Sequence, residues 1–195
     1  MTGTAARRQL ARTTDASDEA LIRRCMDGDA QAWSALIDKY KNLIYSIPIK
    51  LGMHQEAGDI FQAVCVTLLS KLPQLREHRA LPKWLMQTCY HECLQQRRLG
   101  ERHLELDPET MEEPEAREPL PEQMLMELQE EQMLREAVAE MPERCGQMIH
   151  MLFYQIPPRP YEEIAKTFGL AEGSIGLIRG RCLARLRKQL EAMGF

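Results

Sequence analysis

The stretch YEEIAKTFGLAEGSIGLIRG, residues 161–180, decides the fold of the C-terminal part of this chain. A helix-turn-helix needs a small residue in its first helix where the second helix crosses it, a glycine at the turn, and apolar residues that hold the second helix down. Ala165, Gly169, Ile175 and Ile178 stand at these places. The spacing therefore predicts two helices joined by a tight turn at Gly169.

The second helix of this motif carries basic side chains on its open side. At about 100° per residue, its buried stripe contains Ile175, Ile178, Cys182 and Leu186. The opposite face contains Ser174, Leu177, Arg181, Ala184 and Lys188, flanked by Arg185 and Arg187. Arg179 lies close to the apolar stripe, where it could reach a phosphate from the side or bond to a neighbouring helix.

Such a basic face can be a plain solvated surface, but the turn spacing beside it favours nucleic-acid binding. Each phosphate that a cationic side chain neutralises releases counterions, and guanidinium groups match phosphates and guanine edges bidentately. We therefore predict a DNA-binding surface formed by Ser174, Leu177, Arg179, Arg181, Arg185 and Lys188.

Charge is distributed in three blocks along a chain whose formal net charge is −4. Residues 1–98 carry a net +4, residues 99–141 a net −11, and residues 142–195 a net +3. Four prolines interrupt residues 99–121, and no helical period survives there. A polar, charged segment of this kind cannot bury enough apolar surface to fold alone. We predict a flexible acidic linker between two mildly basic domains.

Apolar residues at steps of three and four predict helices in both blocks, so the expected fold is all-α. In the first block such runs begin near Ser17, and Pro48 should kink or end one of them. The expected organisation is a disordered basic arm at 1–16, a helical domain at 17–98, the linker at 99–123, and a helix-turn-helix domain at 124–195.

Several functional classes find no support in the composition. No apolar stretch approaches the roughly 20 residues that span a bilayer, and the N-terminus does not have the pattern of a secretory signal, so we expect a cytoplasmic protein without membrane insertion. The six cysteines show no CxxC pair and are expected to be reduced core residues. Cys89, His91 and Cys93 do not share one helical face, so we predict no metal site and no cofactor. No catalytic triad or phosphate-binding loop suggests an enzyme.

Several pieces of sequence in both blocks resemble one family. In the C-terminal block these are MPER at 141–144, YEEIA at 161–165 and SIGLIRGRCLARLR at 174–187. In the N-terminal block they are DEALIRRCMDGDAQAWSALIDKY at 18–40, AGDIFQAVCVTLLSKL at 57–72 and LPKWLMQTCYHECLQQRR at 81–98. Together they resemble the fourth and second conserved regions of extracytoplasmic-function (ECF) sigma factors of bacterial RNA polymerase.

The resemblance implies that the N-terminal domain binds core RNA polymerase at its beta-prime clamp and opens the minus-ten element. The C-terminal domain would read the minus-thirty-five element of promoter DNA and meet the beta flap, and an anti-sigma factor could cover both domains. The implied polymerase-binding residues are Asp59, Ile60, Gln62 and Leu69. The implied minus-ten residues are Trp84, Gln87, Tyr90, His91, Gln95, Arg97 and Arg98.

Two rival functions remain at this point. A self-sufficient helix-turn-helix regulator would dimerise and bind DNA tightly without polymerase. A helical enzyme would show turnover that a single substitution abolishes.

Overall fold

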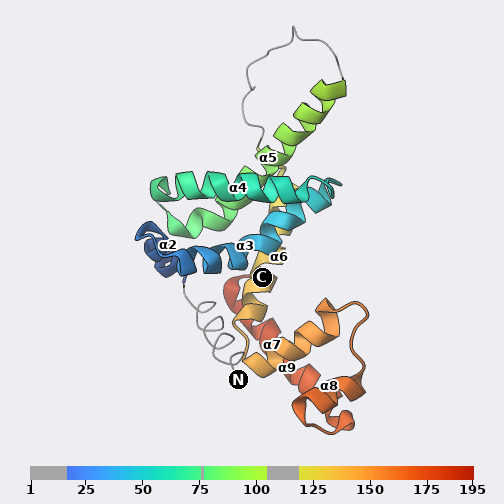
Figure 1. The fold of residues 1–195 in the computed structure, drawn as a ribbon. Coiled ribbons are helices and arrows are strands. Elements are labelled where there is room, and N and C mark those ends of the chain that lie inside the picture. Colours follow the sequence, from blue (N-terminus) through green and yellow to red (C-terminus); the bar gives the residue numbers. More distant parts are fainter. Residues whose placement is uncertain (1–16, 76, 105–118) are drawn as a thin grey trace, which may run out of the picture. The chain divides into compact units, whose positions relative to one another are not determined.

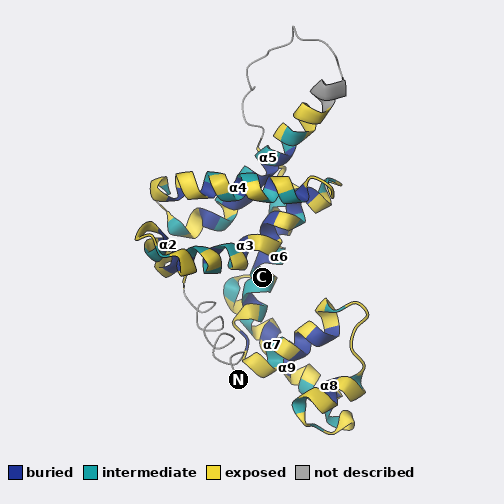
Figure 2. Ribbon diagram, in the orientation of Figure 1, coloured by how far each residue is buried: buried dark blue, intermediate teal, exposed yellow. Residues whose placement is uncertain are grey.

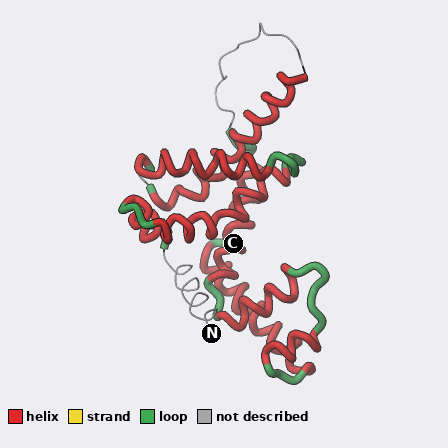
Figure 3. Tube along the Cα trace, viewed as in Figure 1, coloured by secondary structure: helices red, strands yellow, loops and turns green. Residues whose placement is uncertain are grey.

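The computed structural model describes residues 17–75, 77–104 and 119–195 (Figure 1). Within these ranges every regular element is a helix and no strand occurs, which confirms the all-α prediction for the described residues (Figure 3). The expected arm at 1–16 and most of the expected linker, 105–118, lie outside them. None of the described helices is long and apolar enough to cross a bilayer. The chain divides into two compact units between Leu128 and Gln129.

The first unit is a bundle of α2 (Asp18–Met26), α3 (Ala30–Lys50), α4 (Ala57–Lys71) and α5 (Leu81–Leu104). Short 3-10 turns at Leu72–Gln74 and His78–Ala80 connect α4 to α5. The Ser17 hydroxyl accepts a hydrogen bond from the amide of Ala20 at 3.4 Å and caps α2, at the start that the sequence predicted. The Asp29 carboxylate caps α3 in the same way.

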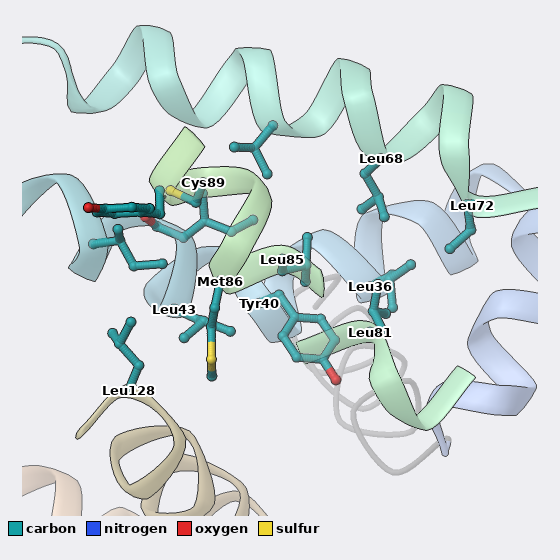
Figure 4. Close-up of a cluster of buried hydrophobic side chains, with 14 of the residues drawn as sticks. Leu36, Tyr40, Leu43, Leu68, Leu72, Leu81, Leu85, Met86, Cys89 and Leu128 are labelled. Carbon is teal, nitrogen blue, oxygen red and sulfur yellow. Dashed lines mark hydrogen bonds between the residues drawn. The ribbon is translucent and has the colours of Figure 1, made fainter. Parts of the chain in front are cut away.

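The core of the first unit lies where the apolar faces of these helices meet (Figure 4). Figure 4 labels Leu36, Tyr40, Leu43, Leu68, Leu72, Leu81, Leu85, Met86, Cys89 and Leu128 among its buried side chains. Leu128 belongs to α6 (Glu122–Ala139) and is fully buried in this core. The prediction that residues from 124 onward belong to the C-terminal domain is therefore wrong for the first turns of α6, because their apolar residues pack on the first unit.

Pro48 lies inside α3 and changes its last turn. A proline has no amide hydrogen, so the carbonyl of Ile44 loses its usual donor four residues later. The Cys89 thiol of α5 donates to this carbonyl, with 3.3 Å between sulfur and oxygen. Helix α3 then ends at Lys50, close to the expected position, and Cys89 connects the two helices where the proline left an acceptor.

Helices extend into both ends of the range that the sequence predicted as a linker. Helix α5 continues through residues 99–104, which contain no proline that would stop a helix, since the first proline of the acidic segment is Pro108. At the other end, α6 already begins at Glu122. Both ends of the predicted range 99–123 are thus helical.

The second unit contains the rest of α6, then α7 (Glu143–Ile149), a π-helical turn η3 (His150–Tyr154), α8 (Tyr161–Phe168) and α9 (Glu172–Met193). Two apolar clusters hold it together. One surrounds Ile164 of α8 and Ile175 of α9, and the other joins Ala137 of α6 to Leu186 of α9. Ile178 packs against both clusters, so α9 joins the two apolar clusters of the unit.

The prediction that all six cysteines are reduced is wrong for two of them. Cys145 of α7 and Cys182 of α9 form a disulfide, with their Cα atoms 5.4 Å apart. They are 37 residues apart in sequence, so only the packing of α7 on α9 brings them together. Cys25, Cys65, Cys89 and Cys93 are free thiols. Burial, with the nearby Asp29 charge, raises the pKa of the Cys25 thiol to about 11, so it stays protonated at neutral pH.

Candidate nucleic-acid interface

A glycine in the left-handed backbone conformation forms the turn between α8 and α9. Gly169 has φ +63° and ψ +40°, a conformation that residues with a Cβ adopt only with strain. The amide of Leu170 donates to the Ala165 carbonyl at 2.9 Å, and the amide of Gly169 donates to the Lys166 carbonyl at 3.3 Å. These bonds close the C-terminus of α8, and the predicted turn at Gly169 is confirmed.

Buried apolar contacts fix how α9 lies on α8. Ile164 and Ile175 are fully buried, and Ala165 is 4% exposed. They pack against Met148 and Leu152, from the segment before α8. The small side chain at position 165 lets α9 approach α8 closely, as the sequence pattern predicted.

The outward face of α9 is cationic. Arg181, Arg185 and Lys188 are exposed, and Leu177 on the same face is 62% exposed. Figure 2 colours much of α9 as exposed. No described residue forms an ion pair with these three cations. Ser174 is half-buried, and its hydroxyl donates to the Ala171 carbonyl at 2.6 Å. The face is therefore available to an anionic partner, with its serine already engaged in the first turn of the helix.

Arg179 points to the neighbouring helix, which is the second of the two possibilities that the sequence left open. Its guanidinium donates to the hydroxyl of Tyr161 at the start of α8. The guanidinium carbon also lies 5.8 Å from the centre of the Tyr161 ring, within cation–π range. Arg179 thus contacts α8 instead of extending the face of Arg181 and Arg185.

Helix α5 carries a second polar face, in the first unit. Trp84, Gln87, His91, Gln95 and Arg98 follow one another at steps of three and four, and none of them is buried. Arg97, beside this face, is exposed. Trp84 also packs against the core from a half-buried position.

Tyr90 does not belong to that face. It is 8% exposed and lies in the core of the first unit, because position 90 follows the buried stripe of Met86 and Cys93. This burial speaks against the expectation that the Tyr90 ring stacks on an unpaired base.

Helix α4 exposes a mixed acidic and apolar stripe. Asp59, Gln62, Val66 and Leu69 follow one another at helical spacing, and Val66 and Leu69 are 68% and 59% exposed. Val66 was not predicted, although the three-four-three spacing from Asp59 to Leu69 could have identified it. Ile60 is fully buried in the core, which corrects its assignment to this surface.

The described residues contain no group of three or more side chains that could hold a metal ion. Cys89 and Cys93 are buried, and Cys89 already bonds to Ile44 as described above. Neither the protein-family models nor the curated protein sequences match this chain. The described residues present three candidate binding surfaces: the cationic face of α9, the polar face of α5 and the stripe on α4.

Proposed function

We propose that this protein is an initiation subunit of the ECF sigma type, which joins core RNA polymerase, directs it to selected promoters and helps to melt them. The observation that carries the proposal is the exposed face of Arg181, Arg185 and Lys188 on α9, behind the turn at Gly169. The chain would act without catalysis or cofactor of its own.

The geometry of α9 suits the major groove of DNA. A groove about 12 Å wide admits one helix, and the helix must be held from behind so that its outer face stays free. Ile175, Cys182 and Leu186 hold it from behind. Arg181, Arg185 and Lys188 would then contact phosphates or guanine edges, while Leu177 would meet an apolar group such as a thymine methyl.

The stripe on α4 suits a protein partner. Exposed aliphatic side chains that lie next to each other and beside charged residues often mark protein contacts. Val66 and Leu69 provide the apolar part, and Asp59 and Gln62 provide polar contacts on the same side. The proposed partner is the beta-prime clamp of core RNA polymerase.

The face on α5 suits single-stranded DNA. An aromatic side chain can stack on an unpaired base, a contact worth about 1–3 kcal/mol. Trp84 and His91 are the ring-bearing residues of this face, and Arg97 and Arg98 would lie along the phosphates. The flexible acidic linker stays an expectation from the composition, and control by an anti-sigma factor stays an expectation from the resemblance.

The proposal is tested by binding of the full chain to purified bacterial core RNA polymerase in size-exclusion chromatography. We expect the wild type to co-elute with the polymerase, and the variants Asp59→Ala with Gln62→Ala and Val66→Ser with Leu69→Ser to lose most of this binding. The matched control is Met26→Ser, which removes another exposed apolar side chain, 54% exposed, from α2. A wild type that never co-elutes would refute the polymerase partner, and double variants that co-elute like Met26→Ser would refute the α4 surface.

Size-exclusion chromatography of the chain alone, together with a DNA-binding assay, distinguishes a sigma-type subunit from the rival helix-turn-helix regulator. A regulator of that class would elute as a symmetric dimer and bind a promoter duplex tightly without polymerase. A sigma-type subunit should bind promoter DNA specifically only in complex with the polymerase.

A further inference from the structure

We infer that the Cys145–Cys182 disulfide is a reversible redox switch, which holds α9 in place when oxidised and loosens the second unit when reduced. The inference rests on the proposed function for its consequence, since α9 carries the proposed DNA-binding face. Its structural part concerns only the stability of the second unit.

The disulfide joins the helix that would contact DNA to the rest of its unit. Cys182 lies on the buried stripe of α9, next to the exposed Arg181. Around it, Leu186 of α9 shares a buried cluster with Ala137 of α6, Ile149 of α7 and Met141, which lies between these two helices. This cluster holds the C-terminal half of α9, whereas Ile175 holds the N-terminal half on α8. The covalent bond thus reinforces the half of α9 that α8 does not hold.

The second unit is small enough for one disulfide to matter. It comprises residues 129–195, below the size at which a single hydrophobic core gives a large margin of stability. Closing a loop over a separation of 37 residues restricts the unfolded chain. In the chain-entropy model, a loop of about that length lowers the unfolding equilibrium constant about 600-fold. Reduction removes this advantage.

The two sulfur atoms differ in their surroundings, which gives the exchange a direction. Cys145 is half-buried, whereas Cys182 is only 2% exposed. A thiolate of a dithiol reductant would attack the sulfur of Cys145, and Cys182 would leave as a thiolate and take up a proton. The second thiol of the reductant then displaces the Cys145 thiolate, which is protonated in turn. The reductant ends as a disulfide, and two electrons and two protons have passed to the protein.

The reverse step needs a two-electron oxidant such as a peroxide. Hydrogen peroxide oxidises one thiol to a sulfenic acid and releases water, and the second thiol condenses with it, forming the disulfide and a second water. A protein that works beside bacterial RNA polymerase is in a compartment where dithiols keep most thiols reduced. The oxidised, tightly held form would therefore prevail under oxidative conditions.

The test compares the full chain after treatment with dithiothreitol and after treatment with hydrogen peroxide. Titration of thiols in the denatured protein should give six in the first sample and four in the second. Amide hydrogen exchange of peptides from α9 should be faster in the reduced protein, by up to about 600-fold where exchange follows unfolding of the unit. Both tryptophans, Trp33 and Trp84, lie in the first unit, so the unfolding transition seen by tryptophan fluorescence should not move.

Two variants complete the test. Cys145→Ala with Cys182→Ala should exchange like the reduced wild type and no longer respond to dithiothreitol. Cys65→Ala, which removes a half-buried free thiol from α4, should respond like the wild type. Equal α9 exchange in samples with six and four thiols would overturn the inference, as would a failure of peroxide to remove any thiol. If the double variant does not fold, the comparison of α9 exchange in the reduced and the oxidised wild type alone tests the inference.

DNA binding shows the functional consequence. At a temperature where nine-tenths of the reduced second unit is unfolded, the apparent affinity for duplex DNA should be about tenfold lower than that of the oxidised protein. If the exchange difference is present but neither form supports binding of core RNA polymerase to a promoter duplex, the proposed function is refuted while the redox switch stands.

Discussion

Removing two cations from the outer face of α9 should weaken the salt dependence of DNA binding by a calculable amount. The double variant Arg181→Ala with Arg185→Ala is the appropriate change, because both side chains are exposed and neither forms an ion pair within the described part of the chain. Alanine has the highest helix propensity, so α9 should stay folded. The perturbation thus removes charge while leaving the buried stripe of the helix intact.

The magnitude follows from the number of cations on the face. If Arg181, Arg185 and Lys188 each neutralise one phosphate, the slope of the logarithm of the binding constant against the logarithm of salt concentration should be about −2.7. In the double variant the slope should be shallower, about −0.9. Between about 50 and about 200 mM salt, the wild type should then lose about 40-fold in affinity and the double variant only about 3.5-fold. Arg179 is not counted, because Tyr161 binds its guanidinium.

Fluorescence anisotropy with a labelled random duplex, titrated at several KCl concentrations, measures both slopes. Arg187→Ala is the matched control, since Arg187 is exposed on the same helix but lies about 120° around it from Arg181. Circular dichroism should show unchanged helicity in all variants. If Arg187→Ala alone reduces the magnitude of the slope by about 0.9, the change expected for each cation of the face, the DNA contact does not follow the predicted face and the reasoning fails.

Three further predictions concern stability. Ala171→Ser should stabilise the second unit by about 1 kcal/mol in urea denaturation, because α9 begins without a side-chain cap; an unchanged midpoint would contradict this. Ile175→Ala should cost about 2–5 kcal/mol, since the side chain is fully buried, and a loss below 1 kcal/mol, measured the same way, would mean that the site collapses. Hydrogen bonds from Arg24 lower the pKa of the Asp29 carboxyl. The ionised carboxylate therefore stabilises the fold at neutral pH, and this stabilisation is lost as pH falls below about 4. Asp29→Asn should therefore flatten the acid limb of thermal stability against pH, and an unaltered limb would exclude this pair.

Local periodicity predicted the parts of the structure that depend on neighbours within about one helical turn. The stripe of Ile175, Cys182 and Leu186 and the turn at Gly169 follow from spacing and from the backbone freedom of glycine. The same is true of the start of α2 at Ser17, where a short polar side chain caps the helix. These features involve residues close in sequence, so the amino-acid pattern contains the information needed to predict them.

Contacts between distant segments could not be predicted in this way. The Cys145–Cys182 bond and the Cys89–Ile44 hydrogen bond join residues 37 and 45 positions apart, and nothing near either partner in sequence identifies the other. The burial of Ile60 and Tyr90 could not be predicted for the same reason. An apolar or aromatic residue at the border of a polar helix face is buried or exposed according to whether a neighbouring helix covers it. Helical spacing says which residues share a face, whereas packing of whole helices selects which face is buried and which stays free to bind.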